Sequence, residues 1–132
     1  MYKYVLDPSI NLHVKEHISE SDALRQMVTA EEILKKLEQS PGQILADEVG
    51  MGKTFVALAI AATIALQNKE GRPVVIMIPS SLQRKWPRDF EKFREMCLPE
   101  ELRGKLKYGV ATRALDFLKF LDDPIDRRKQ II

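Results

Sequence analysis

The chain has 132 residues, of which 45% are hydrophobic and 30% are charged, and its formal net charge at pH 7 is +2. This composition is typical of a globular domain and excludes disordered, collagen-like and fibrous chains. The single cysteine, Cys97, excludes an internal disulfide and favours an intracellular protein, in the bacterial cytoplasm or the nucleus. The longest nearly unbroken apolar run, residues 55–66, is about half of the roughly 20 residues that cross a bilayer, so we expect no membrane partner.

The pattern along the chain predicts two parts, an irregular N-terminal arm at residues 1–20 and one α/β unit at residues 21–132. The arm mixes β-branched and polar residues without a clear period. From Ser21 onward, apolar residues recur at helical spacing until Pro41 ends the pattern. The sequence therefore predicts an amphipathic helix after the arm, capped at Ser21 or Asp22 and either continuous or divided near Thr29.

Apolar runs without polar alternation are typical of strands that are covered on both faces of a parallel sheet. Such runs occupy residues 43–46 and 74–78, and an alanine-rich helix is expected between them at residues 54–67. A third strand is expected at residues 106–111, and residues 131–132 resemble the start of another. Strand, helix and strand in this order form a βαβ unit. We therefore expect an α/β fold in which helices flank a parallel sheet.

Two further helices are expected in the second half of the chain, which also carries most of the positive charge. One begins at Ser80 or Ser81 and continues to about Met96, and Pro87 is expected to kink or divide it. The other covers residues 113–121. A basic half of this kind permits a polyanionic partner without establishing one.

The loop after the first expected strand carries the clearest chemical signal. Its last part matches the end of a phosphate-binding P-loop and reads Gly50-Met51-Gly52-Lys53-Thr54. Asp47 stands where the strict pattern has its first glycine. Two glycines permit the positive φ angles that turn successive N–H groups toward an anion at a helix amino end. Lys53 would face the β and γ phosphates of a nucleotide and the Thr54 hydroxyl would coordinate Mg²⁺, so ATP and Mg²⁺ are the expected cofactors.

Two segments resemble motifs of one family, the Swi/Snf-type helicase-like ATPases of superfamily two. Motif I of that family has an Asp-Glu pair inside the P-loop, as in Ile44-Leu45-Ala46-Asp47-Glu48-Val49-Gly50-Met51-Gly52-Lys53-Thr54. Residues 78–93 are similar to motif Ia, with its Pro, Ser-Leu, Trp and Phe-Glu-Lys-Phe elements in order. Gln26 lies where the family places a glutamine that recognises adenine.

The resemblance covers about residues 24–93 and implies a RecA-like lobe that hydrolyses ATP while the full-length protein translocates on double-stranded DNA. It implies nucleotide contacts from Gln26, Asp47, Glu48, Val49, Gly50, Met51, Gly52, Lys53 and Thr54. Four residues at the start of the expected third helix could contact a DNA backbone: Ser80, Ser81, Arg84 and Lys85. The interleaved acidic residues make an ordinary charged helix face an equal alternative.

The chain also departs from the family. The family's second acidic motif holds Mg²⁺ and activates water at the end of a later strand, whereas the nearest pair, Asp122-Asp123, follows a helix and precedes a proline. The arginine finger, which a second RecA-like lobe normally supplies, is not identifiable either. We therefore interpret the chain as the N-terminal part of a RecA-like lobe that binds ATP with an incomplete catalytic set. A small P-loop phosphotransferase and a non-catalytic partner-binding module remain open as alternatives.

Overall fold

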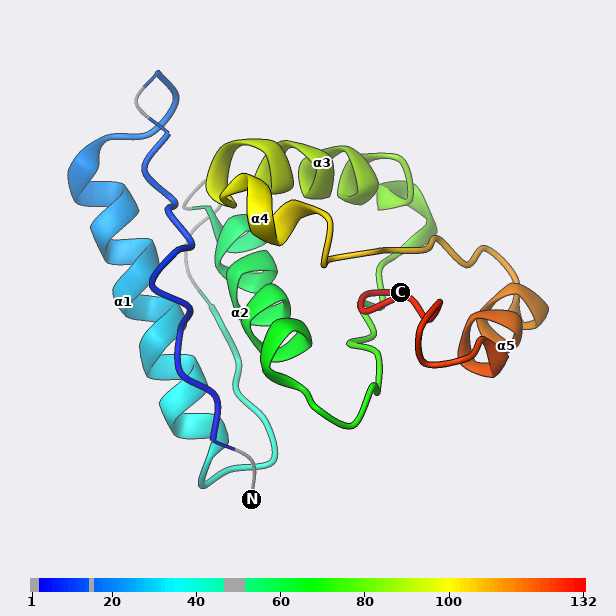
Figure 1. Ribbon diagram of the computed structural model, residues 1–132. Helices are drawn as coiled ribbons and strands as arrows, with labels where there is room; N and C mark the ends of the chain where they lie inside the picture. The colour runs from blue at the N-terminus through cyan, green and yellow to red at the C-terminus, as the bar shows by residue number, and fades with distance from the viewer. Residues whose placement is uncertain (1–2, 15, 47–51) are drawn as a thin grey trace.

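The computed structural model describes residues 3–14, 16–46 and 52–132, and these residues form a body of packed helices with a smaller C-terminal part beside it (Figure 1). Helices α1 and α3 both lie against α2, and α5 stands apart from them on the other side of the C-terminus. The elements run in the order α1 Glu20–Leu37, α2 Lys53–Gln67, η1 Ser80–Leu82, α3 Lys85–Cys97, α4 Glu100–Arg103 and α5 Ala114–Asp122.

Helix α1 confirms the amphipathic helix predicted after the arm, and it is continuous. Its cap is Ser19, whose hydroxyl oxygen accepts a hydrogen bond from the Asp22 N–H at 3.1 Å, so the predicted cap at Ser21 is wrong. Acidic residues occupy the first turn and basic residues the last, an arrangement that complements the helix dipole. At the expected break, the Thr29 hydroxyl donates to the Arg25 carbonyl at 2.9 Å within the continuous helix, so the division near Thr29 does not occur.

Helix α2 confirms the apolar helix predicted at residues 54–67, and it lies between α1 and α3 (Figure 1). Ala59 and Ala62 are completely buried, as is Leu58. Small side chains allow neighbouring helix axes to approach closely, because the distance between axes is set by the residues at the contact. The alanine content of α2 therefore explains how α1 and α3 can both pack closely against it.

The N-terminal arm forms part of the hydrophobic core. Its Leu6, Ile10 and Leu12 side chains are buried. The Gln67 amide at the end of α2 donates to the Val5 carbonyl at 2.6 Å, and the Asn11 N–H donates to the carbonyl of Cys97 at 2.9 Å. The arm thus runs alongside α2 and connects it to the end of α3 (Figure 1).

The expected parallel sheet flanked by helices is wrong for the described residues, which contain no regular strand. Pairing is limited to two isolated parallel bridges, from Ile131 to Val74 and from Ile131 to Tyr108. A buried parallel sheet requires paired neighbours along each strand and cover on both faces. Here Ile44 and Met77 are 93% and 91% exposed, so the two apolar runs lack that cover.

The second half of the chain divides into shorter elements than expected. Residues 80–82 form the short helix η1, and α3 begins only at Lys85, so the helix is divided before Pro87. Pro87 itself lies in the first turn of α3, where its missing N–H has no helical partner to lose. The helix predicted at residues 113–121 is confirmed as α5, although α5 contains no buried residue.

Candidate functional site

The amino end of α2 begins with a left-handed glycine. Gly52 has φ 77° and ψ 21° and is the N-cap of α2. Its carbonyl oxygen accepts the N–H groups of Phe55 and Val56 at 3.0 and 3.1 Å, which starts the helix. Lys53 and Thr54 follow directly, and both are half-buried. Because the first N–H groups of a helix have no partner within it, this end carries partial positive charge and suits an anion.

Gln26 from α1 packs directly on this glycine. Its side chain is 96% buried, since only 4% of the residue is exposed. A Cβ atom built on Gly52 would lie 2.2 Å from Gln26 Nε2 and 3.1 Å from Gln26 Oε1, so only glycine fits there. The Oε1 atom is buried and has no hydrogen-bond partner among the described residues. The structure therefore brings together two predicted site residues, Gln26 and Gly52, that are distant in the sequence.

Helix α3 packs against the amino end of α2 through an aromatic contact, in addition to the contact that Gln26 of α1 makes there. Phe55, in the first turn of α2, contacts the fully buried ring of Phe93 with 6.2 Å between ring centroids. Aromatic pairs at this separation add to the stabilisation that burial provides. The amino end of α2 is thus held between α1 and α3. This contact was not part of the predicted site, although the helical spacing of the apolar residues near Phe93 indicates a buried face.

Five predicted nucleotide-binding residues lie outside the described part of the chain, namely Asp47, Glu48, Val49, Gly50 and Met51. Of the predicted phosphate-binding loop, the structure therefore describes the last three residues, Gly52, Lys53 and Thr54.

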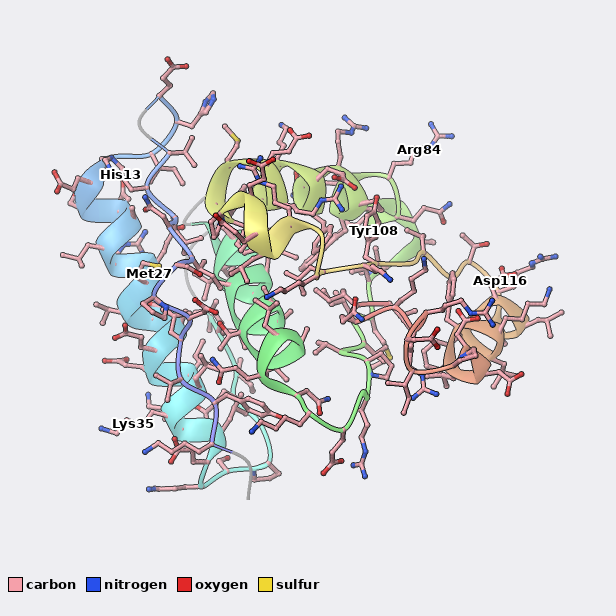
Figure 2. All side chains as sticks on the ribbon, in the orientation of Figure 1. His13, Met27, Lys35, Arg84, Tyr108 and Asp116 are labelled. Atoms are coloured by element: carbon pink, nitrogen blue, oxygen red, sulfur yellow. The ribbon has the colours of Figure 1, made fainter. Side chains whose placement is uncertain are left out.

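The four residues predicted to contact nucleic acid lie at the opposite end of α3 from the amino end of α2 (Figure 1). Ser80 and Ser81 belong to η1 and do not cap α3, whose N-cap is Arg84, so the helix amino end expected at the serines is wrong. The Arg84 side chain extends away from the molecule (Figure 2). Lys85 forms an ion pair with Asp89 one turn later in α3. This arrangement is compatible with a phosphate contact and with an ordinary charged helix face.

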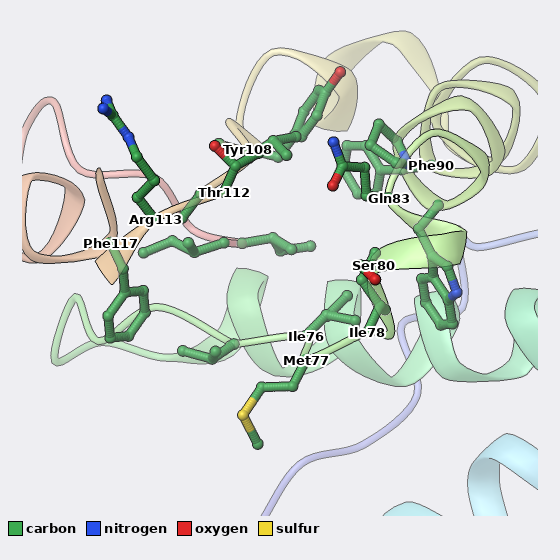
Figure 3. Close-up of a pocket in the computed structure, with 18 of the residues that line it drawn as sticks. Ile76, Met77, Ile78, Ser80, Gln83, Phe90, Tyr108, Thr112, Arg113 and Phe117 are labelled. Carbon is green, nitrogen blue, oxygen red and sulfur yellow. The ribbon is translucent and has the colours of Figure 1, made fainter. Parts of the chain in front are cut away.

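A cavity of about 530 Å³ lies between α3, residues 75–78 and residues 108–114 (Figure 3). Its lining is mainly apolar, with Ser80, Gln83 and Thr112 among the few polar side chains. Two of its lining residues pack on each other, the Tyr108 ring on Phe90, with a centroid distance of 4.7 Å. Burial, followed by a hydrogen bond with Glu91, raises the pKa of the Tyr108 hydroxyl. The sequence did not predict this cavity, because a cavity depends on how distant segments pack.

The acidic pair that was set aside as a catalytic motif lies on α5. Asp122 ends the helix and is exposed, and Asp123 is its C-cap. Across residues 3–14, 16–46 and 52–132, no three His, Cys, Asp or Glu side chains are grouped as a metal site. The same residues contain no helix with both the length and the apolar character needed to cross a membrane.

Comparisons with known proteins give a consistent result. A model of the SNF2-related domain family matches residues 19–105. The chain is 32% identical over 104 residues to the DNA repair and recombination protein RAD54-like of Drosophila erecta, a match that covers 74% of this chain and 13% of that protein. It is 35% identical over 94 residues to an uncharacterized ATP-dependent helicase of Mycoplasma pneumoniae, covering 66% of this chain and 9% of the helicase.

The Zorya protein ZorD of Escherichia coli is 33% identical over 89 residues, which cover 66% of this chain and 8% of ZorD. The chain therefore spans about a tenth of the length of these curated relatives. No solved structure matches the chain.

Proposed function

The chain belongs to the SNF2-related domain family, and we propose that it binds ATP with Mg²⁺ at the amino end of α2. The observation that carries this proposal is the left-handed Gly52 at the start of α2, followed directly by Lys53 and Thr54. A positive-φ glycine at a helix amino end directs backbone N–H groups toward an anion. The ATP-dependent helicase among the relatives adds independent support for ATP as the nucleotide.

Each described residue of the site suits a part of this ligand. The Lys53 ammonium would offset the charge of the β and γ phosphates. The Thr54 hydroxyl supplies one oxygen of the kind that Mg²⁺ prefers, and this ion takes its other ligands from water and phosphate oxygens. The Gln26 Oε1, which has no partner among the described residues, would accept a hydrogen bond from the exocyclic amine of adenine, a donor that guanine lacks at that position. Residues 47–50 and Met51 would complete the phosphate cradle, as the resemblance to motif I implies.

For the whole protein we propose DNA-dependent ATP hydrolysis, with double-stranded DNA as the track. The names of the relatives support this proposal, since they include a DNA repair and recombination protein and a helicase. Ser80, Ser81, Arg84 and Lys85 are the residues proposed to contact the DNA backbone. Hydrolysis also requires a second acidic group and a cation at the transition state, and an arginine finger alone contributes about 10³ to 10⁵ in rate. We therefore propose that this chain alone binds ATP without turning it over.

Calorimetric titration of ATP in the presence of Mg²⁺ tests the proposed binding. Lys53→Ala is expected to weaken binding by about 10-fold to 150-fold, because a hydrogen bond to a charged group contributes roughly 1.5 to 3 kcal/mol. Lys69→Ala is the matched control, because it removes the same charge from an exposed position beyond the other end of α2. Equal dissociation constants for Lys53→Ala and the wild type would contradict the assignment of the phosphate site.

Phosphate release from saturating ATP, with and without duplex DNA, tests the proposed lack of turnover. The expected rate equals that of Lys53→Ala. A DNA-stimulated rate in the ordinary enzyme range of about 1 to 10³ s⁻¹ would show that this chain contains a complete catalytic set, and Asp122 and Asp123 would then be the first residues to substitute.

A further inference from the structure

The Gln26 side chain contacts the start of α2. This contact is separate from the recognition of adenine proposed above. From this contact we infer that Gln26 is a positioning residue for the polyphosphate end of the site, and that its bulk holds Gly52 in the geometry that binds phosphate. This inference rests on the nucleotide binding proposed above. It assigns to Gln26 an effect that is independent of the base.

The contact between the two residues is close and buried. A Cβ on Gly52 would meet the Gln26 amide at 2.2 Å from Nε2 and 2.6 Å from the amide carbon, so the amide occupies the space that a side chain would fill. Gln26 is 4% exposed and therefore has little room to move away. The amide therefore lies against Gly52, the N-cap of α2. The backbone angles of this residue set the direction of α2 and of its first N–H groups.

Glycine alone does not hold this geometry. A glycine backbone reaches both signs of φ with similar ease, so fixing Gly52 at φ 77° requires a restraint from outside the residue. The first turn is held from one side by the contact of Phe55 with Phe93. Gln26 supplies the restraint on the α1 side, where its amide lies against Gly52. Without that restraint, ordering the turn would oppose the binding of an anion.

The two effects of Gln26 depend on different atoms. The restraint on Gly52 depends on the volume of the side chain, whereas recognition of adenine depends on the buried Oε1. Methionine has a similar length and no amide, so Gln26→Met keeps the volume and removes the hydrogen-bonding group. Gln26→Ala removes both. The pair of variants therefore separates positioning from base recognition.

Inorganic tripolyphosphate with Mg²⁺ is the probe, because it has the phosphates of ATP and no base. Its dissociation constant is measured by calorimetry beside those of ATP and GTP, for the wild type, Gln26→Ala and Gln26→Met. Gln26→Ala is expected to bind tripolyphosphate about tenfold more weakly than the wild type. Gln26→Met is expected to restore most of this affinity while its ratio of ATP to GTP affinity falls toward one.

Leu34→Ala is the control for a general loss of stability, because Leu34 is 3% exposed on the same helix and lies two turns beyond Gln26. It is expected to lower the melting temperature and to bind tripolyphosphate like the wild type. The affinity for tripolyphosphate distinguishes the two roles of Gln26. If Gln26 were only structural, Gln26→Ala would lower stability as Leu34→Ala does and would leave the affinity for tripolyphosphate unchanged.

Three outcomes would overturn the inference while leaving the proposed function in place. They are wild-type affinity of Gln26→Ala for tripolyphosphate, equal losses in Gln26→Met and Gln26→Ala, and a wild type that binds ATP without measurable binding of tripolyphosphate. A wild type that binds neither ATP nor tripolyphosphate would overturn the proposed function, and the inference with it.

Discussion

The helical body and the C-terminal part of this protein bury their apolar residues to very different extents. The body consists of the arm with helices α1, α2 and α3, and its central residues Leu12, Leu58 and Phe93 are completely buried. In the C-terminal part, residues 104–132, Leu106 and Ile131 are buried with the core of the body, whereas Leu115 and Leu118 of α5 are 57% and 59% exposed. The Phe120 ring of α5 packs on Gly109.

The difference in burial indicates which region can fix the positions of binding-site residues. The amino end of α2 lies inside the body, between Gln26 of α1 and Phe93 of α3, so two other helices restrain it. The start of α3, with Arg84 and Lys85, is exposed and is fastened by an ion pair on its own helix. A site that must position phosphates within fractions of an ångström needs packed support, whereas a backbone contact to DNA tolerates mobile side chains.

Truncation of one buried ring tests the comparison most strongly. Phe93→Ala is expected to lower the free energy of unfolding by about 3–5 kcal/mol, because it leaves a cavity between α2 and α3. The matched truncation in the C-terminal part, Leu118→Ala, is expected to change it by less than about 0.5 kcal/mol, since Leu118 is exposed. Urea unfolding measures both. Similar losses for the two variants would show that the regions do not differ in packing.

Substitution of the left-handed glycine is expected to have the next largest effect. Gly52→Ala should lower the free energy of unfolding by about 2–5 kcal/mol, because the backbone conformation costs about 1–2 kcal/mol and the clash with Gln26 about 1–3 kcal/mol. Adding Gln26→Ala removes the clash and leaves the backbone cost. The double variant should therefore lose less than the sum of the single variants. Strictly additive losses would contradict the contact between the two residues.

The pH dependence of the free energy of unfolding tests how completely the Cys97 thiol, at the end of α3, is removed from water. Burial raises the pKa of the Cys97 thiol from 9.0 to about 11. In this range the unfolded chain releases the thiol proton first, so the free energy of unfolding should fall as the pH rises from about 9 to about 11. The full loss is about 2–3 kcal/mol at 1.36 kcal/mol per pKa unit. Urea unfolding of the wild type and Cys97→Ala at several pH values should show a steeper decline for the wild type, and parallel curves would exclude this origin.

The smallest expected effect concerns the surface of α5. The hydrogen bond from Arg113 lowers the pKa of the Asp116 carboxyl group, which is partly exposed at the surface of α5. A carboxylate titration by NMR should place Asp116 below an ordinary aspartate, and Arg113→Ala should return it toward the ordinary value. The melting temperature should stay unchanged, because exposed ion pairs contribute little to stability. An unaltered Asp116 pKa in Arg113→Ala would show that the pair is not formed in solution.

Much of the local structure and of the family assignment could be predicted from the sequence. The apolar spacing in residues 20–37, 53–67 and 114–122 predicted the three helices, since a helix is closed by hydrogen bonds within its own segment. The resemblance to the Swi/Snf-type family also came from short motifs, and the match of the SNF2-related domain model to residues 19–105 confirmed it. The predicted Gly52, Lys53 and Thr54 do lie at a helix amino end.

The tertiary structure alone decided the features that join distant segments. A strand is stabilised by a partner elsewhere in the chain, so apolar composition at residues 43–46 and 74–78 could not establish a sheet. In the part of the chain that the structure describes, strand pairing is limited to the bridges at Ile131. Burial of the arm, through Ile10 and Leu12, likewise depends on how α1, α2 and α3 meet. The contact of Gln26 with Gly52 arises from the packing of two helices, and periodicity within either one contains no information about it.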